Sequence, residues 1–157
     1  MAAVQKQGDS AQRRLAEAEP DYAGDVDART AYDVLAGDPK AVLLDVRTAP
    51  EWDFVGRPDL KALGREPVLV PWKHWPEMTV RASFAEEVRA AGVSPDQPVL
   101  LLCRSGQRSR DAAIALTSAG FKACFNIADG FEGPKDEAGH RNTVSGWRAA
   151  GLPWAQG

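Results

Sequence analysis

The sequence predicts one α/β domain of three layers, in which helices cover both faces of a central, mainly parallel β-sheet. Its strand-length apolar runs are hydrophobic at nearly every position instead of alternating, which is typical of strands buried on both faces. Amphipathic segments of helical length fall between those runs. The chain has 157 residues, 44% of them hydrophobic, which is enough apolar material for a single buried core.

The expected elements follow one another with recognisable boundaries. Residues 1–20 are polar and rich in alanine, and we expect a flexible or marginally helical arm ahead of a domain at 21–157. Asp27 precedes 28–37, where an N-cap and a closing glycine predict a short helix. The apolar runs that predict strands are 41–46, about 67–71, 98–102 and 122–128.

Further helices are predicted at 78–92, 109–119 and 143–150. The first of these carries apolar side chains at helical spacing, namely Val80, Phe84, Val88 and Ala91. Gly92 closes the first of these segments and Gly120 follows the second, and each glycine is expected to end its helix.

Composition excludes several classes of protein. A net charge of −3 and a pI near 5.4 argue against a nucleic-acid partner, which normally requires a basic patch. No segment is apolar enough over a sufficient length to span a membrane, and the N-terminus lacks the apolar stretch of a signal peptide. We therefore expect a cytoplasmic protein whose two cysteines are free thiols. The spacing of cysteine and histidine predicts no metal site, and no cofactor is expected.

Cys103 is the residue most suggestive of chemistry, because it follows a predicted buried strand at the edge where α/β domains build their sites. Gly106 permits a tight turn after it, and the helix expected to begin near Ser109 directs its positive dipole end towards the turn. Arg104 and Arg108 add permanent positive charge. These features favour a thiolate and a bound anion, which is the starting point of covalent group transfer.

The loop residues have structural alternatives. A cysteine at the end of a strand is often a small core residue, but a core cysteine needs no polar, cationic loop beside it. The candidate substrate-binding residues are Arg104, Ser105, Gly106, Gln107 and Arg108. The arginines would otherwise be solvated charges, and Ser109, a candidate supporting residue, is expected to cap the following helix.

These motifs together resemble those of single-domain rhodanese-like sulfurtransferases. The likeness runs from about residue 24 to residue 154 and rests on "LLDVRTAPEW", "CRSGQRS" and "GFKACFNIADGFEG…GWRAAGLPW". It implies the three-layer fold and makes Cys103 the nucleophile that takes a sulfane sulfur from a donor such as thiosulfate. The resulting persulfide, cradled by residues 104–108, would pass its sulfur to cyanide, a thiol or a sulfur-accepting protein.

Two other functions remain open at this stage. Cysteine-based phosphatases and some arsenate reductases have a similar loop, which closes on an arginine six positions after the cysteine. Here Ser109 occupies that position and Arg108 comes one residue earlier, so the loop has the shorter length of the rhodanese-like proteins. The other alternative is a sulfur-relay or interaction module without turnover of its own.

Asp45, a second candidate supporting residue, ends the strand at 41–46, on the same edge of the sheet as Cys103. It either orients the loop by accepting hydrogen bonds or belongs to a purely structural network. Arg47 is expected to pair with Glu51 and so to hold the segment that follows the strand.

Residues 52–76 are longer than the corresponding segment of many relatives and are rich in proline and tryptophan. The segment either folds over the cysteine loop and shapes the choice of acceptor, or packs on the flank of the sheet, as expected for Trp52. His74 is expected to be a surface or packing residue. Cys124 is expected to be a buried small residue, with a disulfide to Cys103 as the minor alternative.

Overall fold

The computed structural model describes residues 21–156, so the arm predicted at 1–20 lies outside the described residues. The elements in chain order are β1 (Gly24–Val26), α2 (Ala28–Gly37), β2 (Val42–Asp45), a π-helix (Glu51–Val55), β3 (Arg57–Pro58), a 3₁₀ turn (Lys61–Leu63), β4 (Val68–Leu69), α3 (Phe84–Ala90), β5 (Val99–Leu102), α4 (Gln107–Ser118), β6 (Cys124–Ile127) and β7 (Trp154–Ala155). Within 21–156, no helix is both long and apolar enough to cross a lipid bilayer.

The central sheet has five strands in the order β1-β6-β5-β2-β4, and every neighbouring pair is parallel. The predicted parallel sheet is thereby confirmed. In the middle of it, β2 and β5 pair in register, with Leu43 opposite Leu100. The short strands β3 and β7 form a separate antiparallel pair that the sequence did not indicate.

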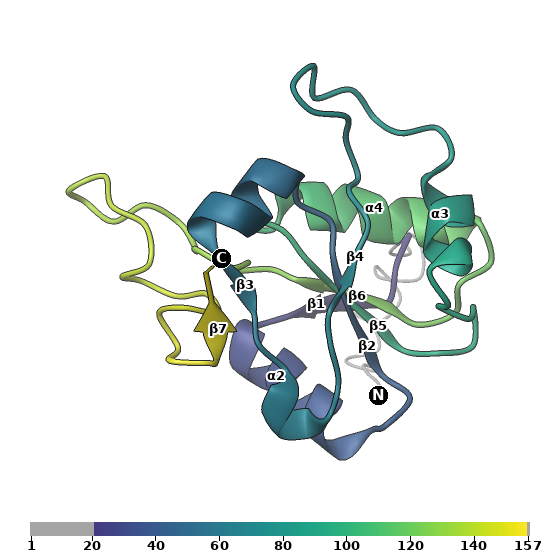
Figure 1. The fold of residues 1–157 in the computed structure, drawn as a ribbon, viewed down its shortest axis with the longest axis horizontal. Coiled ribbons are helices and arrows are strands. Elements are labelled where there is room, and N and C mark those ends of the chain that lie inside the picture. The colour runs from purple at the N-terminus through teal and green to yellow at the C-terminus, as the bar shows by residue number, and fades with distance from the viewer. Residues whose placement is uncertain (1–20, 157) are drawn as a thin grey trace, which may run out of the picture.

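Helices cover both faces of this sheet, with α3 and α4 on one side and α2 on the other (Figure 1). Successive residues of β5 point to opposite faces, so Leu101 joins the cluster under α3 and α4 while Leu100 joins the cluster over α2. This alternation within an unbroken apolar run explains why the strands are hydrophobic throughout. The predicted cap of α2 is also confirmed, since the Asp27 carboxylate accepts a hydrogen bond from the Thr30 amide at 2.8 Å.

The helix predicted at 78–92 is wrong over its first half, because only Phe84–Ala90 is helical. Residues 73–80 form a hairpin loop closed by a bridge between Lys73 and Val80. Phe84 and Val88 are buried as expected, but Val80 is exposed because it lies on that hairpin. The chain between β4 and α3 projects away from the sheet in Figure 1.

The helix predicted at 143–150 does not form. Two amides of this segment bond to another part of the chain: Trp147 N–H donates to Gly130 O at 2.8 Å, and Arg148 N–H donates to Phe131 O at 3.2 Å. Gly146 adopts φ +110°, which is outside the helical region. The segment is a series of turns that docks its buried Trp147 against the α2 side of the core.

Candidate active site

Cys103 stands where β5 ends, on the edge of the sheet predicted to carry the site. Its side chain is only 1% exposed, and Sγ lies 3.1 Å from the Gly106 amide nitrogen and 3.2 Å from the Ser109 hydroxyl oxygen. A cavity of about 260 Å³ lies in front of it and is lined by Lys73, Met78, Cys103, Arg104, Ser105, Gln107 and Arg108. The sulfur is therefore recessed, but it borders a hollow that is larger than one additional atom would need.

The charged residues that line this hollow are all cationic. Lys73, Arg104 and Arg108 line it, and none of its lining residues is a carboxylate. Lys73 is not among the site residues predicted from the sequence, although its place in the chain offers a signal for it. Lys73 follows β4, and the parallel strands β4 and β5 end on the same edge of the sheet. The hollow is accordingly suited to an anion next to the sulfur.

The loop owes its shape to a glycine and to backbone hydrogen bonds. Gly106 adopts φ +106°, and a Cβ at this position would stand 2.2 Å from the Ala128 carbonyl oxygen. The Cys103 carbonyl accepts from the Phe131 amide at 2.8 Å, and the Arg104 carbonyl accepts from the Glu132 amide at 3.0 Å. The segment after β6 therefore fixes the backbone of the loop from behind.

Ser109 does not cap α4 as expected, since the helix begins at Gln107 with Gly106 at the N-cap position. Its hydroxyl is completely buried and lies 2.5 Å from Asn126 Oδ1 as well as 3.2 Å from Cys103 Sγ. Asn126 in turn donates from Nδ2 to Asp25 at 3.1 Å. A chain of polar groups thus runs from the sulfur through the buried Ser109 of α4 and Asn126 of β6 to the exposed Asp25 of β1, and it positions the Cys103 side chain.

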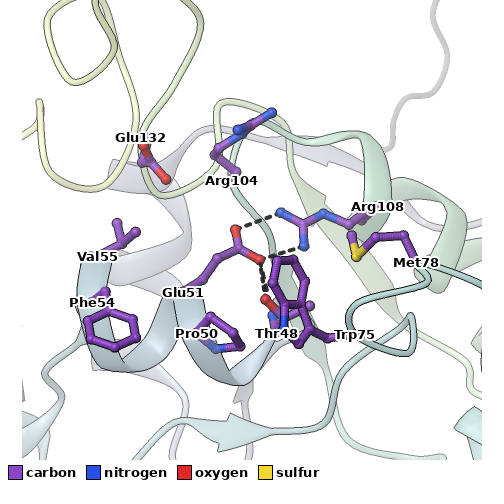
Figure 2. Close-up of a pocket in the computed structure, with 10 residues that line it drawn as sticks. All are labelled: Thr48, Pro50, Glu51, Phe54, Val55, Trp75, Met78, Arg104, Arg108 and Glu132. Atoms are coloured by element: carbon purple, nitrogen blue, oxygen red, sulfur yellow. Dashed lines mark hydrogen bonds and ion pairs between the residues drawn. The ribbon is translucent and has the colours of Figure 1, made fainter.

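Arg108 forms an ion pair that the sequence analysis assigned to a different arginine. Its Nη1 and Nη2 donate to Glu51 Oε1 and Oε2 at 2.7 and 2.8 Å (Figure 2). The expected pairing of Arg47 with Glu51 is therefore wrong. The guanidinium of Arg108 still lines the hollow, but both of its terminal nitrogens are held by one carboxylate.

The carboxyl group of Glu51 has a strongly shifted pKa. Burial raises this pKa, but the hydrogen bonds and charge of Arg108, together with the Thr48 amide and hydroxyl, outweigh burial and lower it from 4.5 to about 2. Glu51 is therefore ionised over the whole physiological range and fastens the π-helix to the cysteine loop.

Glu51→Gln is expected to lower the free energy of unfolding at neutral pH by about 3 kcal/mol, since each pKa unit corresponds to about 1.4 kcal/mol. Because the pKa of Glu51 is lower in the folded state, its stabilisation is complete above 4.5 and is lost as the pH falls towards 2. The difference between wild type and variant, measured by chemical denaturation, should shrink over that interval. Asp53→Asn is the control, because its pair with Arg57 is exposed and 3.9 Å long. A constant difference across the interval would contradict the assignment.

Asp45 belongs to a buried structural network, which is the second of the two roles considered for it. It is fully buried, and its carboxylate accepts from the amide, Nε and Nη2 of Arg47. Arg47 is also fully buried and donates from Nη2 to the Gly56 carbonyl at 2.8 Å. Asp45 therefore acts on the loop only indirectly, because it secures the turn at Gly56 that ends the π-helix carrying Glu51.

The tryptophans of 52–76 serve different purposes. Trp72 is buried and packs edge-on against Phe84 with ring centroids 5.1 Å apart, whereas Trp75 is 59% exposed. Trp75 lines a second cavity of about 500 Å³ next to the cysteine loop, which Figure 2 shows between the π-helix and the hairpin. His74 is exposed, in agreement with the surface position expected for it, and its Nδ1 lies 3.2 Å from Arg81 Nη1.

Cys124 is buried and unpaired, as expected. It stands opposite Val99 at the start of β5, whereas Cys103 follows the end of that strand. Four residues of strand separate the two positions by about 13 Å, at about 3.3 Å per residue, which is too far for a disulfide. Burial raises the pKa of the Cys124 thiol to about 11, so this second sulfur is not a nucleophile at neutral pH.

Comparison with known proteins links this chain to a defined family. Residues 23–157 match the family model described as the STR4 middle domain. An uncharacterized protein of Rickettsia conorii is 35% identical over 79% of this chain and 90% of its own. Rhodanese-like domain-containing protein 4, chloroplastic, of Arabidopsis thaliana is 28% identical over 82% of this chain but only 25% of its own length.

Two solved structures agree with this fold. The crystal structure of Rv0390 from M. tuberculosis matches with a TM-score of 0.80 and 48% identity, over 87% of this chain and 99% of the other. A polysulfide-sulfur transferase homodimer from Wolinella succinogenes matches with a TM-score of 0.57 and 22% identity, over 94% and 88% of the two chains. At that identity the second likeness concerns the fold alone.

Proposed function

Since the chain belongs to the rhodanese-like family, through its match to the STR4 middle domain, we propose that it is a sulfurtransferase that carries a sulfane sulfur on Cys103. One observation carries the proposal. Cys103 Sγ lies within hydrogen-bonding distance of the Gly106 amide and the Ser109 hydroxyl, and it borders a hollow whose charged lining residues are all cationic. Such a setting suits an anionic donor beside the sulfur.

In the proposed first half-reaction, Lys73 and Arg104 attract an anionic donor such as thiosulfate into the hollow. The Cys103 thiolate attacks the outer sulfur, the S–S bond of thiosulfate breaks, and sulfite leaves with the electron pair. The charges balance, because a monoanion and a dianion give a persulfide monoanion and a sulfite dianion. No proton donor is needed for the leaving group, which agrees with a loop that contains no histidine.

In the second half-reaction, a thiophilic acceptor such as cyanide or a thiolate attacks the outer sulfur of the persulfide. The new bond forms to that sulfur, the bond to Sγ breaks, and Cys103 returns as a thiolate. Amides of the loop at 104–108 are proposed to stabilise the outer sulfur. The first half-reaction needs Cys103 as a free thiolate, and we therefore propose that the protein works in a reducing compartment such as the cytoplasm.

The position of Arg108 argues against the phosphatase alternative. A phosphatase loop needs an arginine that is free to bind the transferred phosphoryl group from above. Here both terminal nitrogens of Arg108 bind Glu51, and the residue after Arg108 is the fully buried Ser109. The position six residues after Cys103, where a phosphatase loop has its arginine, is therefore not an arginine. The cationic hollow supports sulfur transfer instead.

Intact-mass measurement after incubation with thiosulfate tests the proposal. We expect the wild-type protein to gain the mass of one sulfur atom, and to lose that mass again when cyanide is added and thiocyanate appears. A parallel incubation with a chromogenic aryl phosphate should release no phosphate. Phosphate release without a sulfur adduct would overturn the proposal, and a persulfide that never turns over with cyanide or a thiol would indicate a relay module instead.

A further inference from the structure

Large apolar side chains are exposed beside the hollow that contains Cys103. Phe54 is 78% exposed, Trp75 is 59% exposed and Met78 is 36% exposed. All three line the cavity of about 500 Å³ described above, which we call the rim groove (Figure 2). Val80, which is 52% exposed, belongs to the same hairpin as Trp75. Exposed apolar side chains that cluster in one place on a soluble protein commonly mark a binding surface.

The rim groove leads directly to the reactive sulfur. Met78, Arg104 and Arg108 line both the groove and the Cys103 hollow, so the two cavities share a wall. A molecule lying in the groove can therefore present one group to Cys103 while the rest of it contacts Phe54 and Trp75. Because Cys103 Sγ is recessed, that group must project from its carrier.

Hydrogen bonds within the chain hold both walls of the groove in place without any partner. On the hairpin wall, His74 N–H donates to Thr79 O at 2.7 Å and Met78 N–H donates to His74 O at 2.6 Å. The opposite wall is the π-helix, whose Glu51 is fixed to Arg108 by two hydrogen bonds. Preorganised walls reduce the ordering cost of association.

Resting on the sulfurtransferase function proposed above, we infer that the rim groove binds a cysteine-containing segment of another protein as the sulfur acceptor. Aromatic residues, methionine and arginine are the types enriched at the centres of protein interfaces, and they line this groove together with Glu51 and Glu132. A small thiol confined to the hollow would leave Phe54 and Trp75 in water, whereas a polypeptide segment covers them. The segment is expected to carry an apolar residue next to its cysteine.

The same segment is expected to carry an acidic residue on the other side of its cysteine. Lys73 and Arg104 line the hollow, and no carboxylate lines it. The acceptor thiolate attacks the outer sulfur of the Cys103 persulfide, so that the acceptor leaves as a persulfide and Cys103 is released as a thiolate. One S–S bond forms and one breaks, and no further oxidant or reductant is required.

Acceptor peptides test this inference on the 157-residue chain after Cys103 has been loaded with sulfur from thiosulfate. We expect Ser-Leu-Cys-Asp-Ser to react with a kcat/KM about tenfold above Ser-Ser-Cys-Asp-Ser, because burial of one leucine is worth about 1.5 kcal/mol or more. It should also react faster than Ser-Leu-Cys-Lys-Ser, because a lysine is repelled by the cationic lining of the hollow. Trp75→Ala and Phe54→Ala, which alter opposite walls, should each remove most of the advantage of the leucine peptide. Neither should alter persulfide formation or turnover with cyanide, which makes no contact with the groove.

Val144→Ala is the matched control, because Val144 is 58% exposed but does not line the groove. It should leave all three peptide rates unchanged. Equal wild-type rates for the three peptides, or an equal effect of Val144→Ala and Trp75→Ala, would overturn the inference. A wild-type dimer that dissociates on Trp75→Ala would overturn it too, since the groove would then bind a second copy. Absence of any persulfide would instead overturn the proposed function on which the inference rests.

Discussion

Cys103→Ser is expected to abolish both the sulfur adduct and the turnover of thiosulfate. A serine hydroxyl is not ionised near neutral pH, and an oxygen at this position has no thiolate with which to attack the donor. The fold should survive, because serine has nearly the same size and its hydroxyl can accept from the Gly106 amide that lies 3.1 Å from Sγ. We expect the free energy of unfolding, measured by chemical denaturation, to change by about 1 kcal/mol or less.

Cys124→Ser provides the matched control, because it makes the same atomic change at the only other cysteine. Burial keeps Cys124 protonated at neutral pH, and the residue stands at the opposite end of β5 from Cys103. The variant should form the persulfide at the wild-type rate even if its stability falls. An adduct on the Cys103→Ser protein, or its loss from the Cys124→Ser protein, would assign the chemistry to a different sulfur.

The sheet and its reactive edge could be predicted because they depend on local patterns. An unbroken apolar run such as 99–102 is stable only where both faces are covered, and this requirement implies helices on either side. In a parallel sheet, a residue that directly follows such a strand must lie at the carboxyl edge. The position of Cys103 in the fold therefore follows from the sequence of β5 and the turn after it.

The pairing of charges around the site could not be predicted in the same way. Arg47 and Arg108 are both compatible with Glu51 in the sequence, and the choice depends on how the π-helix packs. Arg47 is drawn into the core by Asp45 and the Gly56 carbonyl, which leaves Glu51 to the arginine of the cysteine loop. The prediction that Arg47 and Glu51 pair with each other was thus wrong, because three-dimensional packing decides which side chains pair.

The hairpin at 73–80 escaped prediction for a related reason. Val80 falls at helical spacing from Phe84, but its backbone is paired with Lys73 across the hairpin. Spacing alone cannot separate a helix from a turn whose amides find partners elsewhere in the chain. The same cause explains the missing helix at 143–150, since the amides of Trp147 and Arg148 bond to the segment after β6.

Gly106→Ala is expected to reduce sulfur transfer by about 100-fold, since a misplacement of about 1 Å can cost that much in rate. A Cβ here would lie 2.2 Å from the Ala128 carbonyl oxygen, so the loop or β6 must move. The amide that lies 3.1 Å from Cys103 Sγ belongs to the residue that must shift. Backbone strain and the clash together should cost about 3 kcal/mol or more of the free energy of unfolding.

Gly120→Ala separates the clash from the strain. Gly120 adopts φ +104°, almost the same as the +106° of Gly106, but a Cβ there meets nothing within 4 Å. This variant should therefore lose about 1–2 kcal/mol of stability from the backbone conformation alone and keep its rate of sulfur transfer. If the two variants lost equal activity, global destabilisation would account for both. Loss confined to Gly106→Ala would instead tie catalysis to the position of one backbone amide beside the sulfur.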